Sequence, residues 1–234
     1  MKLFQKVIDL SHTTDEHVPV WPGSKRFEKT LVHDYETDGC RVFNYHQCEG
    51  VGTHMDAPAH FIKGGRMIDQ LDANELVLPA CVIDIRPAVQ NNPDYALSLA
   101  DVKKWQAAHG HIPTNAIILM LSGWSQYWPD EKQYRNMDAQ GVMHFPGFSP
   151  EAAHYLVDQN IKAVGVDTFS TDPGVATDYP VHDIFLGNDI YQLENVTNLD
   201  KIPAVGAWVV ALPTKIKDGP EAPTRVIALT PVMD

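Results

Sequence analysis

The stretch CEGVGTHMDAPAHF, residues 48–61, gathers residue types that bind metal ions. Alternate side chains of an extended strand point to one face, so His54, Asp56 and His60 can share a face. Imidazole and carboxylate ligands together suit Zn²⁺ or Mn²⁺. His54 and Asp56 lie about 6–7 Å apart along such a strand, close enough to chelate one ion. The stretch predicts a metal or catalytic site, and a turn-rich loop with surface histidines is the alternative.

His60 stands farther along the same stretch. It lies about 20 Å from His54 if the strand is straight, and nearer if Pro58 turns the chain. We therefore expect His60 to donate or accept a proton at the rim of the site rather than to bind metal directly. Because proline cannot donate a backbone hydrogen bond, Pro58 places the segment at the end or edge of a strand.

These residues resemble the signature H-x-G-T-H-x-D-x-P-x-H of the cyclase-like metal-dependent hydrolases, a family that includes bacterial kynurenine formamidase and isatin hydrolase. The resemblance extends over nearly the whole chain, because further segments resemble the family in the same order. They are VIDLSHTTDEHVPVWPG (7–23), MLSGW (120–124), HFPGFSPEAAHYL (144–156), GVDTFSTDP (165–173) and APTRVIA (222–228).

The resemblance implies a role for each matching position. His54 and Asp56 match metal ligands, and His60 matches the proton-transfer residue. His182 and Glu194, within PVHDIFLGNDIYQLEN (180–195), match a distal pair of ligands. A continuous helix would hold that pair about 18 Å apart, so the chain must turn back between them. The sequence LGND, at 186–189, is a helix stop and turn signal at a suitable place.

One position departs from the family pattern: Gly50 stands where the first motif histidine is expected. Glu49 is adjacent, but in a regular strand its side chain points to the opposite face. It could replace the missing ligand, or support the site from the next shell, if Gly50 and Gly52 bend the chain. Three alternatives follow: a site with one well-held metal, a site assisted by Glu49, and a damaged site with little activity.

The resemblance implies a hydrolase in which a metal-activated water attacks an amide, formamide, lactam or lactone carbonyl. A kynurenine formamidase-like activity is the leading interpretation, with His60 moving the proton. Trp21, in the loop that covers the active site in this family, and Phe61, beside the motif, are the expected walls of the substrate pocket. The alternatives are an isatin-type or lactone ring-opening hydrolase, and a non-catalytic descendant that binds a small ligand.

The elements that must position these residues are those of an α/β domain. We expect one domain, 1–234, with a mixed β-sheet or barrel-like core flanked by helices. Val- and Ile-rich strands are predicted at 6–12, 80–86, 115–124, 162–168, 208–216 and 224–231. Two runs, AIILML and WVVAL, are apolar throughout, which is typical of strands covered on both faces. Helices are predicted at 98–110 and 149–160, with Ser98 and Ser149 as N-caps.

Three other segments carry polar groups without a clear catalytic pattern. Ser122, in LMLSGWSQ, lacks the G-x-S-x-G order of a nucleophile elbow. Asp167 and Asp172 are expected to cap turns and to support the metal ligands from behind. The segment IKDGPEAP, residues 216–223, is expected to be an exposed turn.

Composition limits the partners and the compartment. The 234 residues include 18 Lys and Arg against 30 Asp and Glu, a formal net charge of −12. This balance argues against binding to nucleic acid or an anionic membrane. The N-terminus has no signal-peptide core, no run is long enough to span a bilayer, and the 3 cysteines show no paired spacing. We expect a cytoplasmic protein that acts on a small molecule, and the resemblance implies a homo-oligomer, a dimer or tetramer.

Overall fold

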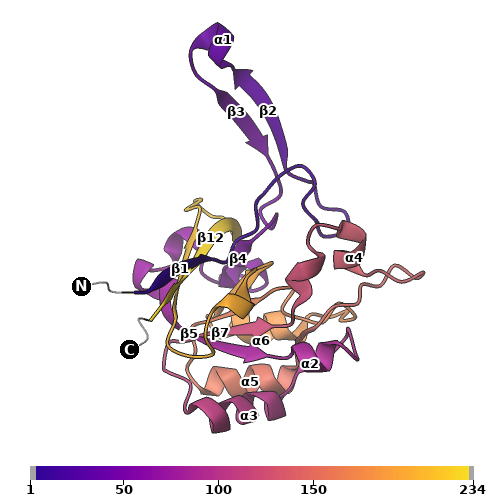
Figure 1. Cartoon of the computed structure of the whole chain (residues 1–234), viewed down its shortest axis with the longest axis vertical. Coiled ribbons are helices and arrows are strands. Elements are labelled where there is room, and N and C mark those ends of the chain that lie inside the picture. Colours follow the sequence, from indigo (N-terminus) through magenta and orange to yellow (C-terminus); the bar gives the residue numbers. More distant parts are fainter. Residues whose placement is uncertain (1–3, 232–234) are drawn as a thin grey trace.

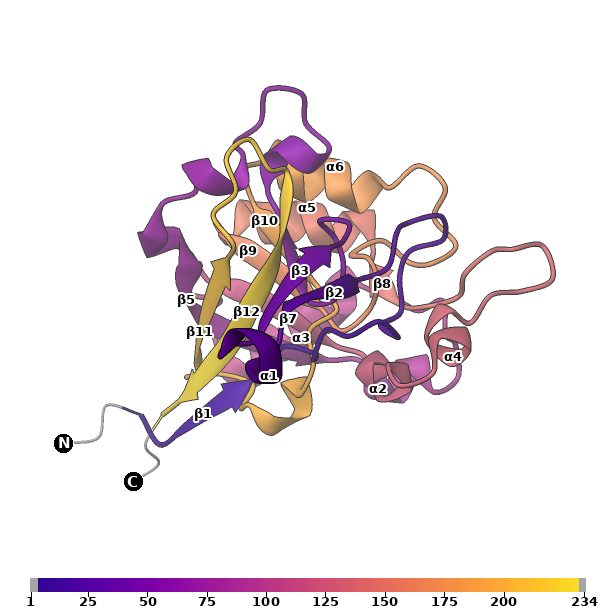
Figure 2. The same cartoon turned by 90° about the horizontal axis from the view of Figure 1, so that it is seen from above.

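The computed structural model describes residues 4–231 and is built around one large sheet. The strand order is β1-β12-β11-β5-β7-β9-β10-β4, and β4 pairs with β12 as well as with β10. The strands from β12 to β4 therefore form a closed, barrel-like ring, with β1 attached outside it (Figures 1 and 2). The strands are β1 (Lys6–Asp9), β4 (His54–Asp56), β5 (Val77–Asp84), β7 (Ile117–Leu121), β9 (Ala163–Val166), β10 (Tyr191–Glu194), β11 (Trp208–Pro213) and β12 (Glu221–Thr230).

Strand pairing is mixed, which confirms the predicted fold class. The strands β5, β7, β9 and β10 run parallel to one another, and the remaining pairs in this sheet are antiparallel. Parallel neighbours need crossover connections, and helices supply them. α3 (Leu99–His109) lies between β5 and β7 in the chain, α5 (Pro150–Asp158) between β7 and β9, and α6 (Pro180–Gly187) between β9 and β10.

The two predicted helices begin where their caps were expected. Ser98 accepts a hydrogen bond from the backbone N–H of Asp101 before α3, and Ser149 does the same for Ala152 at the start of α5. These bonds satisfy backbone donors that the first helical turn leaves free. α3 and α5 lie together against one side of β5 and β7 (Figure 1).

The ring separates two hydrophobic cores. Ile117, Leu119 and Leu121 of β7 belong to the cluster inside the ring. Ile118 and Met120 of the same strand pack in a second cluster with the helices outside it. All five residues are buried, which confirms that this strand is covered on both faces. The two cores explain why β7 is apolar at every position.

The same prediction was wrong for the run WVVAL. In β11 only Val209 and Ala211 are buried, whereas Trp208 and Leu212 are exposed. β11 pairs with β12 and β5, both antiparallel to it, away from the helices that cover β7. Its outer face lacks the second layer that β7 has, so its apolar outer residues meet solvent.

A hairpin arm that the sequence analysis did not predict projects from the body of the molecule (Figure 1). It consists of β2 (Glu28–His33), the short helix α1 (Tyr35–Asp38) and β3 (Val42–His46), and β2 and β3 pair only with each other. Every residue of β2 is exposed.

The remaining elements are short connections. Among residues 4–231, no helix has the length and apolar character needed to cross a bilayer. The short elements are α2 (Arg86–Val89), α4 (Glu131–Arg135), β6 (Ala96–Leu97), β8 (Gly147–Phe148) and the 3₁₀ turns Pro58–His60, Ile68–Gln70, Ala73–Leu76, Trp124–Tyr127 and Leu199–Lys201.

The packing inside the ring allows us to predict how shortening one buried side chain changes the stability of the protein. Leu119→Ala should lower the free energy of unfolding by about 2–5 kcal/mol, because it opens a cavity among fully buried side chains. Leu212→Ala, at an exposed position of β11, is the matched control and should cost less than about 1 kcal/mol. Urea unfolding followed by circular dichroism measures both. Equal losses in the two variants would contradict this account of the core.

Candidate functional site

The closing strand β4 places His54 and Asp56 between two carboxylates. Glu194 of β10 lies opposite His54, and Glu221 of β12 lies opposite Asp56. Met55, between them, points into the core of the ring. Because side chains alternate along a strand, His54 and Asp56 face the outside of the ring, with the two carboxylates beside them. Strand closure alone therefore assembles four polar side chains.

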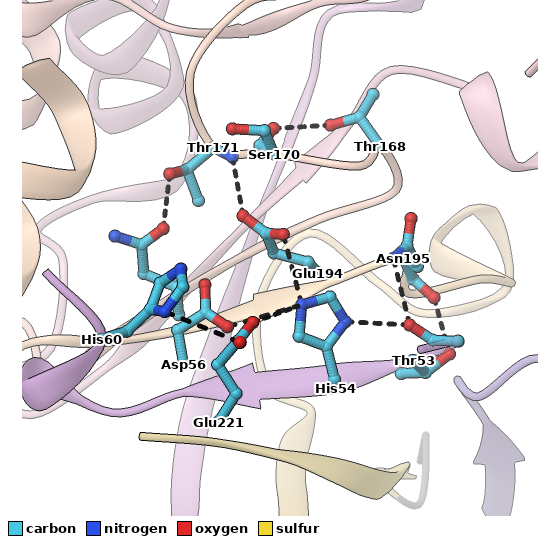
Figure 3. Close-up of polar contacts among 12 residues, drawn as sticks. Thr53, His54, Asp56, His60, Thr168, Ser170, Thr171, Glu194, Asn195 and Glu221 are labelled. Atoms are coloured by element: carbon cyan, nitrogen blue, oxygen red, sulfur yellow. Dashed lines mark hydrogen bonds and ion pairs between the residues drawn. The ribbon is translucent and has the colours of Figure 1, made fainter. Parts of the chain in front are cut away.

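The imidazole of His54 is held in one orientation. Its Nδ1 donates to the backbone carbonyl of Gly52 at 2.9 Å, since a carbonyl oxygen can only accept. This leaves Nε2 facing the carboxylates: it lies 3.4 Å from Oδ1 of Asp56, 3.4 Å from Oε2 of Glu194 and 3.7 Å from Oε1 of Glu221. Figure 3 shows these side chains converging on one space. A fixed tautomer with Nε2 free is the form in which histidine binds metal.

His182 approaches the same space from α6. Its Nε2 lies 3.4 Å from Oε1 of Glu194 and 3.7 Å from Oδ2 of Asp56. Its Nδ1 lies 2.7 Å from Oδ2 of Asp172, which also accepts the backbone N–H of His182. Asp172 thus holds the start of α6 and orients the ring, as expected of a group that supports a ligand from behind. The helix ends at Gly187 and the chain returns through β10, so the predicted reversal between His182 and Glu194 is confirmed.

His60 lies at the rim, nearer than a straight strand would allow. A 3₁₀ turn from Pro58 to His60 follows β4 directly. It brings Nδ1 of His60 within 3.6 Å of Oε2 of Glu221 and its ring centroid within 6.1 Å of that of His182. The His60 side chain is 28% exposed, against 5% for His54 and His182. It is the histidine of the cluster that solvent and substrate reach most easily.

The cluster strongly favours positive charge. Burial would lower the pKa of His54, but hydrogen bonding to Glu194 and the charge of Asp56 outweigh it and raise that pKa to about 10. Burial would raise the pKa of Asp56, yet contact with His182 and the charge of His54 lower it to about 2. Burial and the charge of Asp56 raise the pKa of Glu221 to about 8. Crowded carboxylates create this demand, which a divalent cation also meets.

The residues present fit a divalent metal. Both carboxylate oxygens of Asp56 are buried and have no hydrogen-bond partner among the described residues, an expensive arrangement unless a cation faces them. Ligand atoms of Asp56, His60 and His182 lie within 4.8 Å of one another, and so do those of His54, Asp56 and Glu221. Asp56 belongs to both groups. Oxygen and imidazole donors of this kind bind Zn²⁺, Mn²⁺ and related ions.

Glu221 is the residue that the sequence analysis missed. The segment IKDGPEAP was expected to be an exposed turn, and this is wrong for Glu221, which begins β12 and faces His54. The predicted strand at 224–231 begins three residues too late, because Pro223 reads as a strand breaker. Glu49, the expected replacement ligand, lies in the turn before β4 and belongs to neither group of metal-binding residues. The alternation of buried residues in TRVIALT, continued toward the N-terminus, was the signal that could have placed the start of the strand at Glu221.

The cluster opens into a cavity of about 320 Å³ with aromatic walls. Trp21 and Phe61, the two predicted pocket residues, both line it, together with Phe169 and Tyr179. The ring of Phe61 stacks on His182, with centroids 4.5 Å apart. A larger cavity of about 790 Å³ lies beside α2, but it contains none of the clustered ligands. The chemistry therefore selects the smaller cavity.

Ser122 and Asp167 form a structural contact. The Asp167 carboxylate accepts hydrogen bonds from the backbone N–H groups of Ser122 and Gly123 and from the Ser122 hydroxyl. Burial raises the pKa of Asp167 to about 6. These bonds hold the loop after β7, in keeping with the expectation that Asp167 caps a turn and that Ser122 is not a nucleophile.

The Asp172–His182 contact predicts a change in metal affinity. Asp172→Asn removes the charge that orients the His182 ring, and we expect the Kd for Mn²⁺ or Zn²⁺ to rise on the order of 10–100-fold. Isothermal titration calorimetry of the metal-stripped protein measures this. Asp183→Asn, at an exposed position in the first turn of α6, is the control and should bind like the native chain. A Kd unchanged by Asp172→Asn would refute the orienting role.

Comparison with known proteins agrees with this geometry. The Cyclase family model, described as "Putative cyclase", matches residues 8–173. The chain is 34% identical to the isatin hydrolase of Roseibium aggregatum, covering 97% of this chain and 92% of that protein. It is 27% identical to the kynurenine formamidase of Salinibacter ruber, covering 94% and 96%.

A solved structure supports the same relationship. An isatin hydrolase bound to the product analogue thioisatinate superimposes with a TM-score of 0.92 at 31% identity, over 97% of this chain and 93% of that one. The predicted resemblance is confirmed by these matches and by the fold. The chain belongs to the Cyclase family and is a hydrolase whose clustered side chains fit a divalent metal.

Proposed function

We propose that this enzyme hydrolyses the C–N bond of a planar aryl amide. The observation that carries the proposal is that the cluster around His54 and Asp56 faces a cavity whose other walls are aromatic rings. A cavity of about 320 Å³ has room for a small ring system. Trp21 and Phe61 offer flat apolar surfaces to such a ring, while the polar cluster lies where its carbonyl would point.

The first candidate substrate is a lactam fused to an aromatic ring, of the isatin type. The isatin hydrolases compared above share 34% and 31% identity with this chain, and the kynurenine formamidase shares 27%. An aryl formamide such as N-formylkynurenine is the second candidate, supported by that relative. The sequence analysis placed the formamide first, and both substrates agree with these relatives. Both substrates present an amide carbonyl next to a benzene ring.

We further propose His54, Asp56, His182 and Glu194 as ligands of a divalent cation, Zn²⁺ or Mn²⁺. Their donor atoms lie 3.4–3.7 Å from one another in the contacts described above. The backbone N–H of Thr171 donates to Oε1 of Glu194 at 3.2 Å and helps to hold that carboxylate. When bound, a divalent cation lowers the pKa of water toward about 7 and polarises a carbonyl.

His60 is proposed to move the proton of the reaction. It lines the cavity, and its Nδ1 faces Oε2 of Glu221 at 3.6 Å. From this position at the rim, His60 can take a proton from attacking water and return it to the leaving nitrogen. Phe61, adjacent in sequence and 4.9 Å away between ring centroids, covers one side of His60 and limits water access.

We also propose a reduced, cytoplasmic location and a single domain. Cys40, Cys48 and Cys81 are all free thiols, which supports a reducing compartment. A single domain is supported by the sheet, in which β1 and β12, from the two ends of the chain, are neighbours.

Turnover assays test the proposed reaction. The metal-loaded enzyme should open isatin, or deformylate N-formylkynurenine, with a higher kcat/KM than it shows for an aliphatic lactone. His60→Ala should lower kcat/KM on the order of 10²–10⁴-fold, because it removes the proton-transfer group, and should leave the metal content unchanged. His46→Ala, on the exposed arm, is the control and should retain native kcat/KM.

Two results would contradict this proposal. Turnover confined to lactones would exclude the amide substrate. Loss of metal together with activity in His60→Ala would make His60 a ligand instead of the proton-transfer residue. Absorbance of the substrate and elemental analysis of the protein report the two quantities separately.

The hairpin arm supports a second proposal, that the chain forms a homo-oligomer, a dimer or tetramer. Leu31, Val32, Tyr35, Val42 and Tyr45 of the arm are all exposed apolar or aromatic side chains. A two-stranded hairpin is only marginally stable by itself in water. A second copy of this chain is the partner we propose for the arm, since symmetric assembly is the commonest form of oligomer.

Charge on the apolar face of the arm should disrupt this assembly. Leu31 and Tyr45 lie on the same face of the hairpin, because Leu31 pairs with Phe43 and Lys29 with Tyr45. The double variant Leu31→Asp, Tyr45→Asp should therefore convert the oligomer to a monomer in light scattering coupled to size-exclusion chromatography. A native chain that elutes as a 26.1 kDa monomer, or a double variant with native mass, would refute the proposal.

A further inference from the structure

Gly50 and Gly52, the two glycines of the segment EGVGT, occupy their positions for different physical reasons. Gly52 has φ +73°, a left-handed conformation that other residues adopt only with strain. Gly50 is not among the residues with positive φ, so its backbone conformation does not require glycine. Something other than conformation must account for glycine at position 50.

Space accounts for it. A Cβ atom at Gly50 would lie 2.7 Å from Oε1 of Glu221, closer than real Cβ contacts. The same Cβ would lie 3.3 Å from Nε2 of His54, the nitrogen that faces the metal-binding space. A side chain at position 50 would therefore begin beside His54, in the space that the Glu221 carboxylate occupies.

We propose that Glu221 is a metal ligand that replaces the histidine missing at position 50, and that Gly50 is there to admit it. This inference rests on the proposed metal site and deepens it. Oε1 of Glu221 lies 3.7 Å from His54 Nε2, and its ligand atom falls within 4.8 Å of those of His54 and Asp56. A carboxylate reaching across from β12 thus supplies the donor that the motif of β4 lacks.

The register of the sheet allows Glu221 to take the place of the missing histidine. Glu221 lies directly opposite Asp56 in the β12–β4 pair, so its side chain leaves the sheet on the same face as the other ligands. Its side chain is 18% exposed, between the 7% of Glu194 and the 28% of His60. Glu221 therefore links the buried ligands to the rim, where its other oxygen faces His60.

A competing role for Glu221 is to position His60 without binding metal. Metal affinity separates the two roles, because a group that acts only on His60 leaves the Kd for metal unchanged. The proposal also makes a reciprocal claim that a positioning role does not make: a histidine at position 50 and the carboxylate of Glu221 exclude each other, and either can complete the site.

A double-mutant cycle tests this claim with metal titrations that involve no substrate. The four proteins are the native chain, Glu221→Ala, Gly50→His, and the double variant Gly50→His, Glu221→Ala, each stripped of metal and titrated with Mn²⁺ and, separately, Zn²⁺ by calorimetry. Glu221→Ala should raise the Kd on the order of 10–100-fold. The double variant should recover most of that loss. Gly50→His alone should bind metal no more tightly than the native chain, since the new side chain displaces the end of the Glu221 side chain and the two ligands cannot add.

The outcomes distinguish this inference from the function proposed above. If the native chain binds neither ion, the metal site itself is refuted and both proposals fall. If the native chain binds metal and Glu221→Ala binds it equally well, or the double variant binds no better than Glu221→Ala, only the replacement by Glu221 is refuted. Thermal melts of the metal-stripped variants verify that each is folded. His60→Ala should leave the Kd for metal unchanged, which confines the effect to Glu221.

Discussion

The functional site depends on the way in which the short strand β4 closes the sheet. Its three residues pair with β10 on one side and β12 on the other, so each outward side chain of β4 has a neighbour on both flanks. Those neighbours include Glu194 and Glu221, which surround His54 and Asp56 with carboxylates. A strand with one free edge would leave half of this cluster in solvent. Closure both buries these side chains and aligns them, and it also separates the apolar interior of the ring from the polar site outside it.

Burial of so many charged groups requires support from behind, and the chain supplies it at both buried histidines. The carbonyl of Gly52 fixes the ring of His54, and Asp172 fixes that of His182. In both rings Nδ1 is engaged and Nε2 faces the carboxylates, so the imidazoles need no rearrangement to meet a cation. The demand for positive charge that raises the pKa of His54 is the same demand that a divalent metal satisfies.

The local sequence pattern was sufficient to predict an element where the interaction that fixes it is local, or where the element is buried on all sides. The serine caps of α3 and α5 act within three residues, so their positions are readable from the sequence. The apolar run of β7 reflects cover on both faces. The similar run in β11 gave a wrong prediction of cover on both faces, because an apolar side chain does not reveal whether a second layer lies over it. The hairpin arm was not predicted for a related reason. Its apolar residues are exposed, so no buried face imposes a regular apolar pattern on its strands.

From the sequence one could predict the family, the shared face of His54 and Asp56, and the chain reversal between His182 and Glu194, whereas the turn that brings His60 back was left open. Each of these predictions follows from the spacing of residues within one segment, or from a motif. The position of Glu221 beside His54, and the lack of space for a side chain at position 50, became visible only in the folded chain. Their relation depends on the register between β12 and β4, strands distant in the chain, and that register is set by closure of the whole ring rather than by any local spacing.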